Sequence, residues 1–453
     1  MSLLGPRIFL LASLLAGFAP AQDQPDAGAR DQQEPTFEAP SILSRDSNFT
    51  ESNGKPLEFG LFGKVSGVYD SGLTPVISIA PGMPFASEAG AGVEASFGAA
   101  LSRRWRHSKL AVEYRGAYRQ YASASLFNGV DQFFQLAYSR ELERHLRLDY
   151  KSTLGTTRLA NGEFAYLPIS SLDRLGLPLN ELFDNRTNYL ESRLDLTRQK
   201  TARLSFGFGG DGFIVRRQSL WLAGLNGYSA RASVAYRLTS RQTISASYDN
   251  TYFDFQRAFG NSRLQIPTLG YALALARHWD FAAQAGVARV EMLGLTQVAL
   301  DPAIVALTGE SFATVTFSRA SYLPVGEARL TRAFKTASLT FDYTMGVTPG
   351  NGYYLTSRQT SAAIGYTYRA GKSWEMRGNA GYYQLSALGQ TLGKFTNVQA
   401  GAEVFYNLTR SAHLDVRYDY RRYTTENSIL QKDSNRVSLG IAFSLGETFR
   451  SVR

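Results

Sequence analysis

Cysteine is absent from this chain of 453 residues, and histidine occurs only four times. Without cysteine the chain can form no disulfide, no thiolate metal site and no lipid attachment through a thiol. The histidines are too scattered for a histidine metal site or for a nucleophile with a histidine base, and they are His107, His145, His278 and His413. We therefore expect no cofactor and no enzymatic activity.

Long apolar runs are also scarce. The one candidate, residues 8–18, follows Arg7 and precedes Ala19-Pro20-Ala21, which is the order of a basic segment, an apolar segment and an A-x-A cleavage site. A membrane-spanning helix needs about 20 apolar residues, so this run is too short to be an anchor. We expect residues 1–21 to be a signal peptide that is removed on export.

Apolar residues are few in residues 22–56 as well, where Gln, Asp, Glu, Pro and Ser predominate. Such a segment cannot bury enough surface to offset the entropy of ordering it, so we expect a disordered periplasmic tail. The tail holds seven acidic and three basic residues, and residues 1–21 hold one basic residue. The formal net charge of +10 therefore becomes +13 on residues 57–453.

Residues 57–445 are a succession of short segments in which every second residue is apolar. In 437–445 one register reads Val, Leu, Ile, Phe, Leu and the other reads Ser, Gly, Ala, Ser. Because side chains alternate faces along a strand, such a segment has one apolar face. The pattern recurs about eighteen times, with about 16 to 18 as the expected range, at the length of a tilted membrane-spanning strand.

The connections between these segments alternate between two kinds. Short polar turns are expected at 104–106, 142–144, 199–200, 240–241, 278–279, 335, 371–372 and 410–411. Longer links, which lie between them, include 70–89, 158–185, 214–226, 292–317 and 425–434. Antiparallel hairpins with short turns at one end and long loops at the other are typical of outer-membrane barrels.

Aromatic residues gather near the ends of the segments. Trp105, Trp279 and Trp374 fall at the short turns, where an amphipathic ring would lie at a membrane interface. A second set falls near the opposite ends and predicts a second girdle; it comprises Tyr121, Phe127, Phe213, Tyr252, Phe253, Tyr353, Tyr354 and Tyr423.

These patterns predict an all-β fold in which residues 57–453 form a transmembrane, antiparallel, up-and-down β-barrel with short periplasmic turns and long extracellular loops. A lipid environment requires a closed sheet, because an open edge would leave backbone groups unpaired. A secreted β-sandwich or solenoid would also show alternation. A single soluble core rarely takes so many long hairpins, so we favour the barrel.

With these features the chain resembles the outer-membrane β-barrel proteins of Gram-negative-type bacteria, and especially porin-like channels. The resemblance is architectural and covers residues 57–445; it implies location in the outer membrane, contact with outer-membrane lipid and insertion by the barrel assembly machinery. Many such proteins end in an aromatic residue, whereas here Phe443 and Leu445 are followed by residues 446–453. An assembly signal would therefore be internal.

The register opposite the apolar one carries charge and is expected to line the pore. In 414–421 it reads Asp, Arg, Asp, Arg between Leu, Val, Tyr and Tyr. Both signs occur, so the charges could form a self-neutralising network that braces the lumen, or clustered guanidinium groups could favour anions. The pore-lining candidates are Glu113, Arg115, Arg119, Arg147, Asp149, Arg193, Arg231, Arg237, Arg377, Asp415, Arg417, Asp419 and Arg421.

Two long links could control such a pore. Residues 158–185 are apolar for a free loop and lie between the fifth and sixth strands, where the resembling porins fold a constriction loop inward. We expect this segment to present Asp173, Arg174, Glu181 or Asp184 to solutes, unless it packs on the outer surface. The link 293–307 is expected to form a short helix or a cap.

The function expected from the resemblance and the charged lumen is a channel for hydrophilic solutes, anions among them. About eighteen strands would leave an aqueous channel. An export conduit for an exopolysaccharide and a closed structural or adhesion barrel are the alternatives. The expected partners are the solute or polysaccharide and the lipid, and a homo-oligomer is compatible with the sequence. Nucleic acid is not expected, because an exported barrel has little access to it.

Overall fold

The computed structural model describes residues 57–73, 88–158, 183–276, 278–309, 311–371, 373–389, 393–409, 411–426 and 431–445, all of which belong to one compact unit, Glu38–Arg453. The predicted signal peptide and periplasmic tail lie outside the described residues, as does most of the link 158–185. These three assignments remain predictions.

The described residues form eighteen strands, one short α-helix and one 3-10 turn, Ser125–Phe127. The strands are β1 Leu57–Leu73, β2 Glu88–Arg104, β3 Ser108–Tyr121, β4 Gly129–Glu143, β5 Leu146–Thr157, β6 Thr187–Gln199, β7 Leu204–Arg217, β8 Gly224–Thr239, β9 Gln242–Gln256, β10 Gly260–Ala276, β11 Trp279–Ala299, β12 Phe312–Ala333, β13 Ala337–Thr348, β14 Ser357–Ala370, β15 Trp374–Ala387, β16 Phe395–Asn407, β17 Ala412–Thr425 and β18 Gln431–Leu445.

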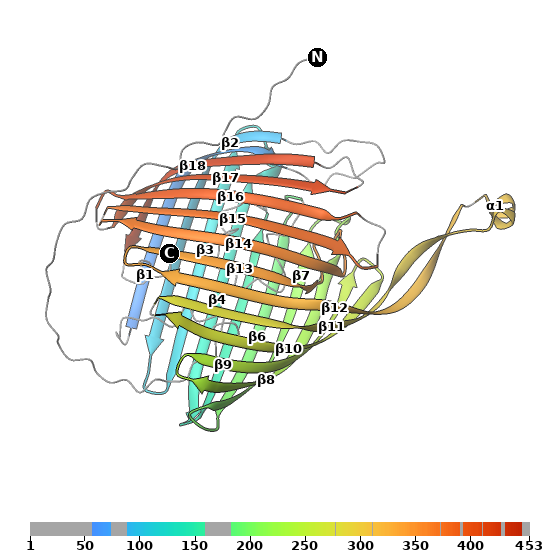
Figure 1. The fold of residues 1–453 in the computed structure, drawn as a ribbon. Helices are drawn as coiled ribbons and strands as arrows, with labels where there is room; N and C mark the ends of the chain where they lie inside the picture. Colours follow the sequence, from blue (N-terminus) through green and yellow to red (C-terminus); the bar gives the residue numbers. More distant parts are fainter. Residues whose placement is uncertain are drawn as a thin grey trace, which may run out of the picture. The chain divides into compact units, whose positions relative to one another are not determined.

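These strands make one closed antiparallel barrel (Figure 1). Each strand pairs with its neighbours in the chain, and β1 pairs with both β2 and β18, which closes the ring. Closure leaves no open edge between β18 and β1, which is what a membrane-spanning sheet requires. The sequence-based prediction of an all-β, up-and-down barrel of about eighteen strands is confirmed.

The connections separate the barrel into two ends. Eight connections of two to four residues, such as residues 144–145 and 240–241, join strands at what we call the turn end. The other connections, such as residues 74–87 and 349–356, lie at the opposite end, which we call the loop end. Short turns at one end and longer loops at the other were predicted from the alternating polar segments.

The outer surface is apolar. Side chains such as Val65, Phe97 and Leu439 are more than half exposed, and each belongs to the apolar register of its strand. At the turn end the three predicted tryptophans are exposed or half-buried, and Arg332 stacks on Trp279 with 4.6 Å from its guanidinium carbon to the ring centre. This surface is suited to lipid with an aromatic border.

The predicted second girdle is largely wrong. Six of its members are buried, each with at most 4% of its surface exposed: Tyr121, Phe127, Phe213, Phe253, Tyr354 and Tyr423. They belong to the register opposite the exposed apolar side chains or to loops, so they pack inside the barrel. Tyr252 alone of this set lies in the outward register, where its ring lies 5.4 Å from that of Tyr228. The sequence correctly placed these aromatic residues near the strand ends, but it did not show whether each one faces outward or inward.

The link predicted over 292–317 is also different in the structure. Strands β11 and β12 extend through most of it and run past the other strands as a two-stranded arm (Figure 1). At the tip lies the helix α1, Pro302–Thr308, capped by Asp301 and ended by Gly309 at a φ of 73°. The expected short helix forms. The strand extension follows from the alternation of 312–317, Phe-Ala-Thr-Val-Thr-Phe, which was assigned to a loop.

No helix in the described part of the chain has both the length and the apolar character needed to cross a membrane.

Candidate functional site: the barrel lumen

The inner face of the wall is identified by alternation. On β3, Tyr118 is 48% exposed, whereas the adjacent Arg119 is 1% exposed; on β17, Tyr418 is exposed and Asp419 is buried. Side chains in the register opposite the outward apolar residues therefore point into the lumen. The structure places all the predicted pore-lining residues in this inward register.

One group of inward charges is buried near the loop end, and we call it the buried network: Asp70, Glu94, Arg119, Asp131 and Arg436. Arg119 donates to Glu94 at 3.1 Å and pairs with Asp131. Arg436 donates to the same Glu94 at 2.9 Å and lies 3.4 Å from Asp70. Charge-assisted hydrogen bonds thus link five strands, β1 to β4 and β18. Strands β1 and β4 each join the network through a single residue with one partner.

These buried charges are structural rather than solute-binding. Every member has at most 4% exposure, and Tyr121 donates its hydroxyl to Asp70. Two arginines facing three carboxylates leave little net charge, so the network braces the wall. Asp70, Asp131 and Arg436 were not among the sequence-based candidates, although each lies in a charged register.

A second group of inward arginines is more accessible. Arg147, Arg193, Arg231, Arg377 and Arg417 have side-chain exposures of 42%, 19%, 16%, 24% and 12%. We call them the lumen arginines. Some lie near the turn end and others in the middle of their strands, whereas the buried network lies near the loop end. Lumen water can reach each of them.

Each lumen arginine is held by a carboxylate from its own or a neighbouring strand. Arg417 donates to Asp419 at 2.7 Å and Arg147 to Asp149 at 2.9 Å, in each case two residues along the same strand. Between strands, Arg231 lies 3.2 Å from Asp211. Such pairs fix the guanidinium groups along the wall while leaving part of each one exposed.

The remaining predicted pore-lining residues extend the same pattern. Arg115 pairs with Glu113, Lys64 lies 2.6 Å from Asp415, and Arg421 donates to Asn397 at 3.2 Å. Arg237 lies in the inward register of β8 and is half-buried. The described residues contain no group of three or more His, Asp or Glu side chains placed to hold a metal ion.

Most of the predicted constriction loop cannot be placed. Asp173, Arg174 and Glu181 lie outside the described residues, whereas Asp184 is described and half-buried. The adjacent Phe183 is buried, and its ring lies 6.4 Å from that of Tyr353 in the loop between β13 and β14. The described end of this segment therefore reaches a loop that belongs to a distant part of the ring.

The loop between β13 and β14, residues 349–356, is largely buried against other loops, which the sequence reasoning missed. Asn351 accepts hydrogen bonds from the backbone N–H groups of Tyr353 and Tyr354, at 3.2 and 2.9 Å. Gly352 has a φ of 86° and accepts a 3.0 Å backbone hydrogen bond from Ala223 in the loop between β7 and β8. Loops separated by six strands thus meet over the lumen.

Apolar contacts strengthen this meeting of loops. Phe183, Leu222 and Tyr354 pack together with inward residues of β15 to β17, namely Tyr383, Leu385, Phe395 and Tyr423. Burial, with a smaller effect of the neighbouring Tyr353, raises the pKa of Tyr354 to about 12, so its phenol stays neutral. The sequence signal was Pro-Gly-Asn-Gly followed by Tyr-Tyr-Leu, a turn that carries unusually apolar residues.

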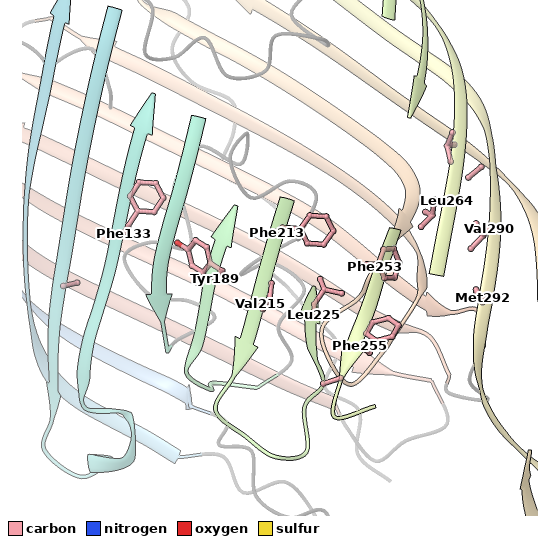
Figure 2. Packing of buried hydrophobic residues seen from close by; sticks show 14 residues of the cluster. Phe133, Tyr189, Phe213, Val215, Leu225, Phe253, Phe255, Leu264, Val290 and Met292 are labelled. Carbon is pink, nitrogen blue, oxygen red and sulfur yellow. The ribbon is translucent and has the colours of Figure 1, made fainter. Parts of the chain in front are cut away.

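The inner face of the wall from β4 to β12 is apolar near the loop end (Figure 2). We call this region the apolar sector; it comprises Phe133, Tyr189, Phe213, Val215, Leu225, Phe253, Phe255, Leu264, Val290, Met292 and Val325. It runs from β4 to β12, and it was not predicted, because the inward register was expected to be polar throughout.

The lumen therefore has two chemical levels. Toward the turn end, half-exposed arginines and carboxylates can hydrate and bind ionic groups. Toward the loop end lie the buried network, the apolar sector and the converging loops.

No protein-family model matches the chain, and no curated protein does. Solved structures similar to it include OccK2 (OpdF) of Pseudomonas aeruginosa in complex with glucuronate, at 11% identity and a TM-score of 0.44, covering 86% of this chain and 98% of that one. A BenF-like porin from Pseudomonas fluorescens Pf-5 has 10% identity, a TM-score of 0.44 and coverages of 86% and 99%.

OccAB3 of Acinetobacter baumannii is similar at 8% identity with a TM-score of 0.42, covering 86% of this chain and 99% of that one. The strand pairing of this chain by itself shows the barrel fold.

Proposed function

We propose that this protein is an outer-membrane channel that passes small hydrophilic solutes and prefers anions. The observation that supports the proposal most is the row of half-exposed lumen arginines inside a closed eighteen-strand barrel. An apolar outer face fits lipid, and a barrel of this size leaves an aqueous interior. The expected export signal and the formal charge of +13 on the barrel region agree with this location and preference.

The preference for anions follows from which charges water can reach. Asp211 and Asp419 are buried, whereas their partners Arg231 and Arg417 are 16% and 12% exposed. The arginine is the more exposed member in four of the five pairs, and the exception is Arg193, whose partner Asp195 is more exposed. A passing solute therefore meets guanidinium groups more often than carboxylates. Arg presents several donors in a fixed plane, which suits carboxylates and phosphates.

The absence of enzymatic activity, contact with the barrel assembly machinery and a homo-oligomeric state remain predictions. So do the alternatives of a polysaccharide conduit and a closed adhesion barrel. The packing of loops over the lumen is compatible with a gated channel or with a closed barrel, and electrical recording separates the two.

The test is single-channel recording in planar bilayers, with the reversal potential measured across a salt gradient. We expect steady openings and an anion preference that shrinks toward zero in the triple variant Arg147→Gln, Arg193→Gln, Arg231→Gln. The matched control removes three arginines from the outward register, Arg103→Gln, Arg263→Gln, Arg332→Gln, and should keep the preference. A folded barrel that remains silent would overturn the channel proposal, and equal loss in both triple variants would overturn the role of the lumen arginines.

A further inference from the structure

The pairing of β12 with β13 stops at Met345, three residues before the end of β13. It covers Gly326 to Ala333 of β12 against Met345 to Ser338 of β13. Strand β12 continues through Phe312–Val325 while paired to β11 alone. In the described residues, the loop-end half of β12 therefore has a free edge on the side of β13.

A proline explains where the ladder ends. Ala333 donates its N–H to His278 on the β11 side, and Phe334 donates to Ala337 on the β13 side. Because backbone groups alternate sides along a strand, even-numbered residues of β12 face β13. The next such residue beyond Gly326 is Pro324, which has no N–H to donate.

The second proline inside a strand does not open the wall. Pro267 interrupts the pairing of β10 with β11, yet the ladder resumes in the same register, with Gln265 opposite Arg289 and Thr268 opposite Gly286. Pairing with β9 continues through Pro267 itself. Pro267 thus provides a control within the same barrel.

Apolar side chains of β12 and β13 pack against the apolar sector near the place where the two strands part. Phe317 and Leu323 of β12, Val347 of β13, Leu355 and Leu388 all pack against the apolar sector. The Phe317 ring lies so close to two glycines that a Cβ on Gly389 or Gly294 would come within 2.6 or 2.7 Å of it. The seal is therefore made of side chains, where the rest of the wall is sealed by backbone hydrogen bonds.

This seal joins two apolar regions. On the lumen side lie Val325, Val290 and Met292 of the apolar sector, all buried. On the outer face Tyr322 is 70% exposed in the register that faces lipid. Displacing side chains costs less than breaking a ladder of backbone hydrogen bonds in lipid, where unpaired groups find no water.

We propose that the wall opens between β12 and β13 near the loop end, and that a small amphipathic molecule with an apolar body passes there between the apolar sector and the surrounding lipid. This function goes beyond the proposed channel, in which hydrophilic solutes travel along the barrel axis. The axial route depends on the lumen arginines, and the lateral route depends on Pro324 and the side-chain seal.

The experiment uses the full-length mature protein in lipid vesicles with a long-chain carboxylic acid that carries a diazirine on its tail. After irradiation, residue-level mass spectrometry reports which side chains were labelled. We expect labelling of inward Leu264 and Val290 in the wild type, together with outward Leu269 and Leu293. The outward residues serve as the internal control, because lipid reaches them whether or not the wall opens.

Closing the opening should remove only the inward labels. Because the chain has no cysteine, the variant Pro324→Cys, Val347→Cys contains a single thiol pair at positions that face one another in the continued register. Oxidation should abolish labelling of Leu264 and Val290, and reduction should restore it. Pro324→Val, which supplies the missing donor, should lower the inward labels, whereas Pro267→Val should not.

Each result decides for or against the lateral route. Inward labels that are absent from the wild type, that survive both closures, or that fall equally in Pro267→Val would overturn it. If the two thiols do not form a disulfide, two other variants still test the lateral route. Pro324→Val should lower the inward labelling, and Phe317→Ala should raise it. Axial conductance should be unchanged in the closed variants, so failure of the lateral proposal is distinguishable from failure of the channel.

Discussion

At the scale of single residues, Arg119 shows why a charge can be enclosed in the wall of this barrel. Its side chain is 1% exposed, and its guanidinium is shared between Glu94 and Asp131. An unpaired charge there would be very costly, whereas a paired and hydrogen-bonded one is tolerated. Removing Arg119 would leave Asp131 without its arginine, whereas Glu94 would keep its bond from Arg436. A buried carboxylate that has lost its partner is the reason that buried pairs are sensitive to single substitutions.

We predict that Arg119→Met destabilises the barrel by about 3–5 kcal/mol, because it leaves Asp131 buried without its arginine and Glu94 with Arg436 as its one remaining arginine. Reversible urea unfolding in lipid vesicles measures this difference. The matched control is Arg147→Met, which breaks a pair whose members are 42% and 36% exposed. Its expected cost is at most about 1 kcal/mol, since exposed pairs contribute little. Equal costs for the two variants would refute a structural role for the buried network.

At the scale of elements, the loop 349–356 and the arm of β11 and β12 depart most from a regular barrel. The loop is shaped by two glycines of positive φ, and a Cβ on Gly352 would lie 2.8 Å from the Ala223 carbonyl oxygen. Only a residue without a side chain allows the two loops to meet at this distance. The constriction therefore depends on backbone conformation as well as on the aromatic rings.

We predict that Tyr353→Ala combined with Tyr354→Ala raises single-channel conductance, because the packing of Tyr354 against Phe395, with ring centres 6.0 Å apart, is lost. Planar bilayer recording measures the change. Tyr252→Ala removes a ring from the outward register, where it faces Tyr228, and should leave the conductance as it was. Unchanged conductance in the double variant would mean that the loop does not restrict the passage.

At the scale of the whole molecule, the barrel combines a basic excess with internal pairing of opposite charges. The formal charge of +13 belongs to residues 57–453 as a whole, and the lumen arginines are the part of it that faces the lumen water. Interactions across such water are screened by salt, over about 10 Å at 0.1 M and about 3 Å at 1 M. Selectivity that arises from charge must therefore depend on ionic strength.

We predict that the anion preference of the wild-type channel is strong when the salt gradient is centred near 0.1 M and weak when it is centred near 1 M, because the screening length shortens threefold. Reversal potentials at the two mean concentrations provide the measurement. The same preference at both concentrations would assign selectivity to the width of the constriction and not to the lumen arginines.

Much of this architecture was predictable from local patterns. Alternation specifies a strand and its two faces wherever it persists, as in 437–445, and the short polar segments marked the turn end. The same reasoning failed for Phe213 and Phe253, which were expected in an outer girdle, because a residue at a strand end can satisfy either face. The reasoning also failed for residues 312–317, which were assigned to a loop. Their alternation was present, but the apolar link next to it made the start of the strand hard to recognise.

The sequence by itself determined a barrel of about eighteen strands, the inward register of the arginines and the apolar outer face, because these follow from a two-residue period and from the demands of lipid. Only the tertiary structure decided which inward charges are buried, which loop reaches across the lumen and where the ladder of β12 ends. Those features depend on contacts between residues far apart in the chain, such as Ala223 with Gly352, and no local period encodes such pairs.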